Sequence, residues 1–232
     1  MIVLSEVTST SDWILARAGE LPDGTWVRAE RQTAGRGRQG RGWTTLPGNL
    51  AASGLVKLRP GDGPAEQIGF AAGVALHETL LPAAGAESLL LKWPNDLLLG
   101  QGKLAGILLE RQGDAIVVGV GANLASAPEV PGRKTAALPP PPPAPDAVLA
   151  MLESRLAHWL DQWRTAGFEA VRAQWCRRAH PPGTLLHVAG PLAVSGRFRD
   201  LGTDGALLLD TPGGPMTIRA GDVLLAEPEG VS

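Results

Sequence analysis

The segment from Ser88 to Leu124 constrains the fold most, because it holds four short apolar runs with almost no room between them. The runs read SLLLKW, DLLLG, KLAGILLER and AIVVGVGANL, and Gly, Pro, Asn or Asp residues separate them. Parallel neighbours would need crossover connections of a dozen or more residues, usually a helix, and these gaps are far shorter. The segment therefore predicts strands that pair antiparallel as hairpins, and an α+β fold.

The rest of the chain predicts further strands and helices around this core. Strand-like text covers 1–7, 25–30 and 49–58, and helical patterns cover 13–20, 64–85 and 146–178, with tryptophans 159, 163 and 175 on probable core faces. Short strands separated by Gly, Pro and Asp turns follow residue 183 and predict a small barrel. We place a domain boundary near Pro181, which gives a main domain of 1–180 and a small domain of 181–232.

Composition excludes several classes of protein. The net charge of −2 argues against a surface devoted to nucleic acid, and no apolar run approaches the roughly 20 residues that span a bilayer. The single cysteine, Cys176, cannot form an internal disulfide, and the first residues do not resemble a signal peptide. The four histidines lack metal-ligand spacing, so we expect no metal site made by the protein alone. A cytoplasmic protein without membrane contact is expected.

Residues 35–40, GRGRQG, match the G-x-G-x-x-G pattern of dinucleotide-binding loops. A Rossmann loop needs a buried strand before it, a helix after it and an acidic residue about 20 positions on, and none of the three is present. The kinase signature is also missing, and an Arg/Gly-rich RNA-binding tail would be terminal. What remains is a glycine loop with arginines 31, 36, 38 and 41, which suits an anionic ligand. A solvated surface turn is the alternative.

A second candidate element is KWPNDLLLGQGKLAGILLE, residues 92–110. It places Lys92, Asn95, Asp96 and Lys103 on one predicted hairpin. Only four of the 21 basic residues in the chain are lysines, so two of them beside Asn-Asp suggest a compact point charge instead of a guanidinium fork.

Together with TST near the N-terminus and VGVGANL at 118–124, these two elements occur in the order and spacing of bacterial biotin protein ligases, which the chain resembles over almost its whole length. The resemblance implies a mixed sheet with helices, related to class II aminoacyl-tRNA synthetases, and a C-terminal SH3-like barrel. It implies that biotin and MgATP give biotinoyl-5′-AMP, and that a lysine on a carboxylase's biotin carboxyl carrier domain then takes the biotinoyl group.

The resemblance also assigns residues. Lys103, Arg38 and Asp96 would be catalytic: Lys103 at the carboxylate and α-phosphate, Arg38 with Arg36 nearest both anions, and Asp96 orienting or deprotonating the acceptor lysine. The remaining biotin or adenylate contacts would be Ser9, Thr10, Ser11, Gln32, Gly35, Gly37, Arg41 and Gly106. Lys92 and Asn95 would serve the nucleotide or Mg²⁺, and Asn123 would contact the nucleotide.

Some points depart from this pattern or stay open. Ser11 stands where the family commonly has Asn, and STSD at 9–12 is also a good helix N-cap. With the first strand expected at residue 2, we expect a monofunctional ligase that does not bind DNA. A lipoate–protein ligase and an Arg/Gly-loop nucleic-acid binder are the alternatives. The resemblance allows a monomer or a homodimer.

Overall fold

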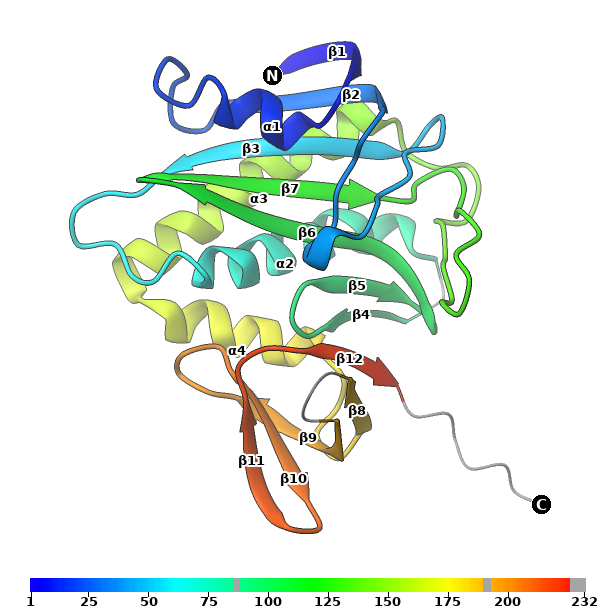
Figure 1. Ribbon diagram of the computed structural model, residues 1–232, viewed down its shortest axis with the longest axis vertical. Helices are drawn as coiled ribbons and strands as arrows, with labels where there is room; N and C mark the ends of the chain where they lie inside the picture. The colour runs from blue at the N-terminus through cyan, green and yellow to red at the C-terminus, as the bar shows by residue number, and fades with distance from the viewer. Residues whose placement is uncertain (86–87, 190–192, 226–232) are drawn as a thin grey trace.

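The computed structural model describes residues 1–85, 88–189 and 193–225, which form two sheets and the helices that pack on them (Figure 1). The large sheet has seven strands in the order β1-β2-β3-β7-β6-β5-β4. Their bounds are Ile2–Val7, Trp26–Gln32, Leu50–Lys57, Leu89–Lys92, Asp96–Leu99, Gly102–Gln112 and Ala115–Ala122 for β1 to β7. Strands β4 to β7 pair antiparallel with their neighbours, which confirms the predicted hairpins. The parallel β1–β2 pair makes the sheet mixed.

Three helices cover one face of this sheet: α2 (Gln67–Leu80), α3 (Pro145–Ala166) and α4 (Phe168–Arg178) (Figure 1). The main hydrophobic core lies between them and the strands. The predicted tryptophans of α3 and α4 are buried there, which confirms that prediction. The helical segment expected at 146–178 is two helices, because Gly167 adopts a left-handed φ of 78° between α3 and α4.

The other face of the sheet carries α1 (Thr10–Leu15), which packs on a small apolar cluster beneath Ile14. Side chains alternate between the two faces of a strand. On β7, Val118 and Val120 therefore belong to the main core, while Gly119 and Gly121 line a pocket on the opposite face. The glycines leave this part of the face hollow.

The C-terminal region forms an antiparallel sheet of five strands in the order β11-β10-β9-β8-β12. The strands are Leu185–Ala189, Val194–Leu201, Leu207–Thr211, Gly214–Ile218 and Asp222–Leu225 for β8 to β12. The predicted strands are thus present, but within the described residues β11 and β12 remain edges, and no pairing closes the sheet into the expected barrel. The boundary expected near Pro181 lies between the end of α4 and the start of β8 and stays a prediction.

Side chains join the small sheet to the main domain. The Trp93 indole donates to the carbonyl of Gly205 at 3.0 Å, and the Arg172 guanidinium donates to Asp200 at 2.9 Å and to the carbonyl of Leu201 at 2.8 Å. Burial raises the pKa of the neighbouring Cys176 thiol to about 12, so this thiol is inert at neutral pH. Among the described helices, none is both long and apolar enough to cross a bilayer.

Candidate active site

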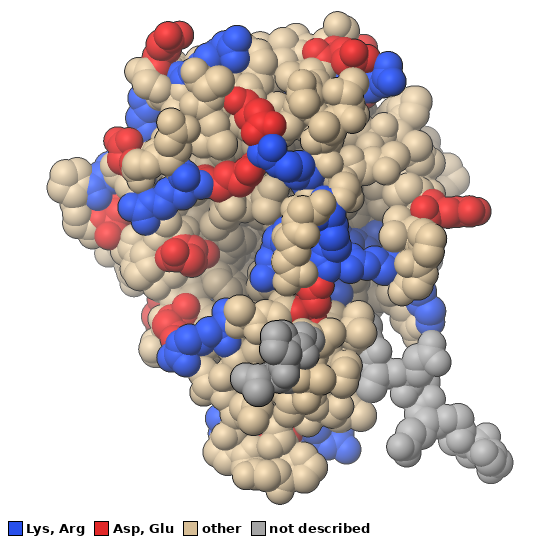
Figure 2. Space-filling model, viewed as in Figure 1, with Lys and Arg blue, Asp and Glu red and all other residues tan. Residues whose placement is uncertain are grey.

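A cavity of about 140 Å³ opens on the face of the large sheet that carries α1. Residues 35–43, which we call the flap, follow β2 and lie over this face of the large sheet (Figure 1). Five cationic residues and one carboxylate line the cavity, namely Arg36, Arg38, Arg41, Lys103 and Arg133 with Asp96. Figure 2 shows Lys and Arg side chains gathering where the flap meets the β5–β6 hairpin. The charge balance favours an anionic ligand.

One end of the cavity is a buried cluster of hydroxyl and amide groups. The Ser53 hydroxyl lies 2.8 Å from Thr10 Oγ1 and 3.1 Å from Ser11 Oγ, and Gln32 Oε1 accepts from the Thr10 amide at 2.9 Å. Ser9 caps α1, because its hydroxyl accepts from the amide of Asp12. The capping alternative therefore applies to Ser9, while Thr10 and Ser11 turn their hydroxyls toward the sheet. Groups of this kind can hydrogen-bond a neutral polar ring such as a ureido group.

The flap is a narrow hairpin closed by backbone hydrogen bonds. The Trp43 amide donates to the Gly35 carbonyl at 2.9 Å, and the Gly37 amide donates to the Arg41 carbonyl at 2.6 Å. Gly35 has no room for a side chain, since a Cβ would lie 2.5 Å from the Trp43 carbonyl oxygen. The turn itself uses left-handed conformations at Gln39 and Gly40, with φ values of 57° and 71°.

Each of the three arginines of the flap contacts a different part of the molecule: Arg36 contacts α1 and β6, Arg38 contacts the turn before β5, and Arg41 contacts the small sheet. Arg36 pairs with two carboxylates, Asp12 of α1 and Glu110 of β6. Arg38 donates to Asn95 Oδ1 at 3.3 Å.

Arg41 forms a two-pronged ion pair with Asp222 of β12 in the small sheet. This guanidinium holds the pKa of Asp222 below its ordinary value, and Asp222 in turn raises the pKa of Arg41. The flap therefore contacts both the large sheet, through Glu110 of β6, and the small sheet, through Asp222 of β12.

The hairpin of β5 and β6 supplies the charges beneath the flap. Lys103 Nζ lies 2.5 Å from one carboxylate oxygen of Asp96, and Lys92 Nζ lies 3.3 Å from the other. Lys92 also donates to the carbonyl of Val223 at 3.0 Å, which ties β4 to β12. Asp96 thus lies between two ammonium groups. Lys103 lines the cavity, whereas both lysines line the neighbouring groove.

Two glycines face each other across β6 and β7: Gly121 makes room for the flap's Trp43, and Gly106 makes room for Lys103. A Cβ on Gly121 would lie 2.5 Å from Nε1 of the indole, and a Cβ on Gly106 would lie 3.0 Å from Lys103 Nζ. The ammonium group of Lys103 lies 5.7 Å from the centre of the Trp43 ring, within the range of a cation–π interaction. The indole therefore forms one wall of the cavity.

Asn123, at the end of β7, is buried and lines the same cavity. Its amide nitrogen donates to the carbonyl of Lys103 at 3.3 Å and to that of Ala136 at 3.1 Å. Its Oδ1 is buried and has no hydrogen-bond partner among the described residues. Because buried polar atoms rarely lack a partner, this oxygen is available to a ligand's N–H group.

Comparison with known proteins agrees with this geometry. Residues 3–123 match the model of the biotin/lipoate A/B protein ligase family. The chain is 38% identical to biotin--[acetyl-CoA-carboxylase] ligase of Paracoccus denitrificans, over 95% of this chain and 98% of the relative. The chain therefore belongs to the biotin/lipoate A/B protein ligase family. It is also 38% identical to the enzyme of that name from Mycobacterium tuberculosis, over 96% of this chain and 87% of the relative.

Among solved structures, the biotin protein ligase of Aquifex aeolicus in complex with biotin and ATP has the same fold. The TM-score is 0.85 at 26% sequence identity, and the match covers 98% of both chains. The fold predicted from the sequence, a biotin-ligase-like mixed sheet with helices, is thereby confirmed.

The structure brings most of the predicted residues of this family member to one cavity. Those that line it are Ser9, Thr10, Ser11, Gln32, Arg36, Gly37, Arg38, Arg41, Asn95, Asp96, Lys103, Gly106 and Asn123. Gly35 lies directly beside it in the flap, and Lys92 lines the neighbouring groove. Their individual roles stay predictions.

Several residues of this cavity were not predicted from the sequence, among them Ser53, Gly119, Gly121, Trp43 and Arg133. Ser53 gave no signal, since a single serine in an apolar strand is unremarkable. Gly119 and Gly121 did give one, because glycines two apart in VGVGAN must share a face of the strand. Trp43 follows the glycine loop directly and was passed over.

Proposed function

We propose that this protein is an ATP-dependent biotin–protein ligase that works through biotinoyl-5′-AMP. The observation that carries the proposal is one cavity with two different ends. A buried hydroxyl and amide cluster around Ser53 forms one end, and a group of cations around Lys103 and Arg38 forms the other. Biotin has the same polarity, with a neutral ureido ring at one end and a carboxylate at the other.

In the first step, a biotin carboxylate oxygen attacks the α-phosphorus of ATP and pyrophosphate leaves. Two anions must approach each other, so positioning and charge neutralisation lower the barrier most. Lys103 and Arg38 both line the cavity, and we expect them to neutralise the carboxylate and the α-phosphate. We expect Asn123 Oδ1, which is buried and has no hydrogen-bond partner among the described residues, to accept from an N–H group of the nucleotide.

We expect Mg²⁺ to arrive on the triphosphate, and Asp96 and Asn95 would have to give up contacts with Lys92, Lys103 and Arg38 to hold it. Mg²⁺ commonly takes one or two carboxylates together with phosphate oxygens and water, and Asp96 and Asn95 supply the side-chain oxygens here. No group of three or more His, Cys, Asp or Glu residues suited to a metal occurs in the described part of the chain. Bound with ATP, the ion would neutralise charge on the phosphates, next to Asn95 and Asp96.

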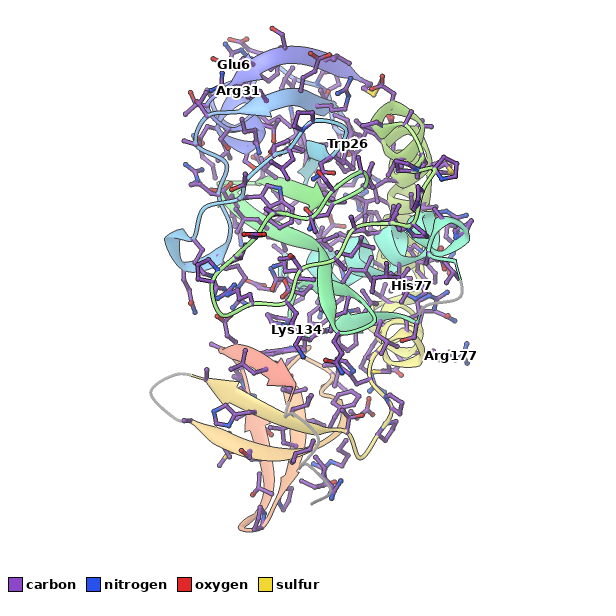
Figure 3. All side chains as sticks on the ribbon, turned by 90° about the vertical axis from the view of Figure 1, so that its right-hand side faces the viewer. Glu6, Trp26, Arg31, His77, Lys134 and Arg177 are labelled. Atoms are coloured by element: carbon purple, nitrogen blue, oxygen red, sulfur yellow. The ribbon has the colours of Figure 1, made fainter. Side chains whose placement is uncertain are left out.

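In the second step, the acceptor lysine's amine attacks the carbonyl carbon of the mixed anhydride, and AMP leaves. A groove of about 1090 Å³ runs from the cavity between the β4–β6 hairpins and the small sheet. Lys134 lies at this border in Figure 3, where its ammonium group donates to Gln101 at 2.7 Å. The groove gives an acceptor lysine on a carboxylase carrier domain access to the adenylate, beside Asp96. We propose Asp96 as the group that orients this amine or accepts its proton.

The test is transfer to an apo carrier domain with MgATP and either biotin or lipoate, followed by mass spectrometry of the acceptor. We expect a single lysine to gain one biotinoyl group and no transfer of lipoate. Transfer of lipoate alone would favour the lipoate-ligase alternative. Failure of both, together with steeply salt-dependent binding of RNA or DNA, would favour the nucleic-acid alternative.

A further inference from the structure

The side chain of Arg36 joins the flap to two elements that are distant in the sequence. Its Nη1 donates to Asp12 Oδ2 at 2.9 Å, and its Nη2 lies 2.5 Å from Asp12 Oδ1 and 2.8 Å from Glu110 Oε1. Asp12 belongs to α1 and Glu110 to β6, and neither lines the cavity. We call these three residues the Arg36 clamp.

The charges of the clamp depend on the position of the flap. The Oε2 atom of Glu110 is buried and has no hydrogen-bond partner among the described residues, so Arg36 is the cation that compensates this carboxylate. If the flap lifted, Glu110 would keep a partly buried negative charge without its partner, which is costly. Asp12 would lose a two-pronged contact, the strongest form of an arginine–carboxylate pair. The ion pairs of the Arg36 clamp therefore favour the closed position of the flap over an open one.

Fixing Arg36 also fixes the parts of the flap that face the cavity. Arg36 lies between Gly35 and Gly37, and both of these form the backbone hydrogen bonds that hold the hairpin together. Trp43 is attached directly to Gly35 by one of those bonds, and Arg38 follows Gly37. A displacement of Arg36 therefore also displaces Trp43, which forms one wall of the cavity, and Arg38.

We infer that Asp12 and Glu110 are positioning residues, which keep the flap closed over the adenylate through Arg36. This inference rests on the proposed function. A mixed anhydride hydrolyses if water reaches it, so an enzyme that stores one until the acceptor arrives needs a lid that stays shut. Asp12 and Glu110 do not line the cavity, so they act on the bound ligand only through Arg36, which does. Its loss should shorten retention of the adenylate without changing the groups that form it.

The experiment compares Glu110→Gln and Asp12→Asn with the unaltered protein, loaded with biotin and MgATP and then freed of small molecules by gel filtration. The rate at which biotinoyl-5′-AMP or its hydrolysis products leave the protein is measured without acceptor. We expect this rate to rise roughly 2- to 5-fold in each variant, the scale of a lost, partly exposed ion pair. The KM for ATP in pyrophosphate release should change less than twofold.

A second measurement needs no activity. Trypsin cuts after arginines 36, 38 and 41, so the rate of cleavage within the flap reports how often it opens. Both variants should be cut faster than the unaltered protein. The matched control is Glu6→Gln, which breaks the exposed 2.7 Å pair between Glu6 and Arg31 at the β1–β2 edge (Figure 3) and should change neither rate. Glu110→Asp, which keeps the charge, should restore part of the retention.

The outcomes separate the two proposals. If the unaltered protein forms no adenylate, the proposed function fails, while the trypsin comparison still tests the clamp. If adenylate forms, and Glu110→Gln retains it and resists trypsin as well as the unaltered protein does, the clamp is wrong. Asp12 lies in the first turn of α1, and its substitution could unfold that helix. Glu110 lies within β6, outside α1, so its variant decides the matter in that case.

Discussion

Replacing Gly121 with alanine should weaken biotin binding and leave the fold intact. The added Cβ would lie 2.5 Å from Nε1 and 2.6 Å from Cζ2 of the Trp43 indole, whereas non-bonded carbon atoms prefer about 3.5–4.0 Å. The indole must therefore move by about 1 Å or more. Because Trp43 belongs to the flap, the displacement falls on the wall of the cavity and spares the main core, which lies on the other face of β7.

Overpacking of this kind costs about 1–3 kcal/mol. If the closed flap bears that cost, the Kd for biotin rises roughly 5- to 150-fold, while the midpoint of thermal unfolding without biotin stays nearly constant. Isothermal titration with biotin and a thermal melt measure the two quantities. The matched control is Gly19→Ala, outside the cavity, where a Cβ meets nothing within 4 Å and the backbone is not left-handed. An unchanged Kd for Gly121→Ala, or an equal loss in the control, would refute this reasoning.

Four further outcomes are expected. Lys103→Ala should slow pyrophosphate release by roughly 100-fold or more with little change in the KM for the acceptor, and the reverse pattern would move Lys103 to the second step. Arg38→Ala should fold normally but slow adenylation or release the adenylate early, and normal rates of both would remove Arg38 from the mechanism. Burial lowers the pKa of His180 to about 4, so between pH 6.5 and pH 4 the unfolded chain binds a proton that the folded protein does not. The free energy of unfolding therefore falls by roughly 3 kcal/mol as the pH drops through this range. Urea titrations should show that His180→Gln lacks this pH dependence, and equal pH dependence in the two proteins would contradict the assignment. Arg41 lowers the pKa of Asp222, so the stability from this pair is fully present above the ordinary aspartate pKa of 3.8 and is lost as pH falls through the lower pKa of the folded state. Asp222→Asn should remove this part of the pH dependence of the unfolding free energy. An unchanged pH dependence in acid would show that the pair contributes nothing.

The sequence predicted those parts of the fold that depend on neighbouring residues. The hairpins of β4 to β7 follow from apolar runs and turn residues that lie side by side in the chain, and their tight spacing excludes crossovers. The break at Gly167 was missed, because one glycine within a helical pattern is compatible with a continuous helix until its backbone conformation is known.

The candidate site shows the same division. Most of the polar residues that line the cavity come from short motifs that are visible in the chain, and Ser53 and Arg133 are exceptions. The partners of the flap's arginines are not visible, since Asp12 and Glu110 lie 24 and 74 positions from Arg36, and Asp222 lies 181 positions from Arg41. The packing of α1 on the large sheet, the place of β6 within that sheet and the contact between the two sheets bring these carboxylates to the flap. Ion pairs between residues so far apart in the sequence could not be predicted from local sequence patterns.

The most direct test of the proposed chemistry is to identify what the protein holds after reaction without an acceptor. The protein is incubated with biotin and MgATP, separated from free small molecules, and its bound ligand is released and analysed by mass spectrometry. The cavity described above predicts about one equivalent of biotinoyl-5′-AMP per chain. Recovery of unreacted biotin and ATP alone, or an adenylate that forms with lipoate but not with biotin, would contradict it.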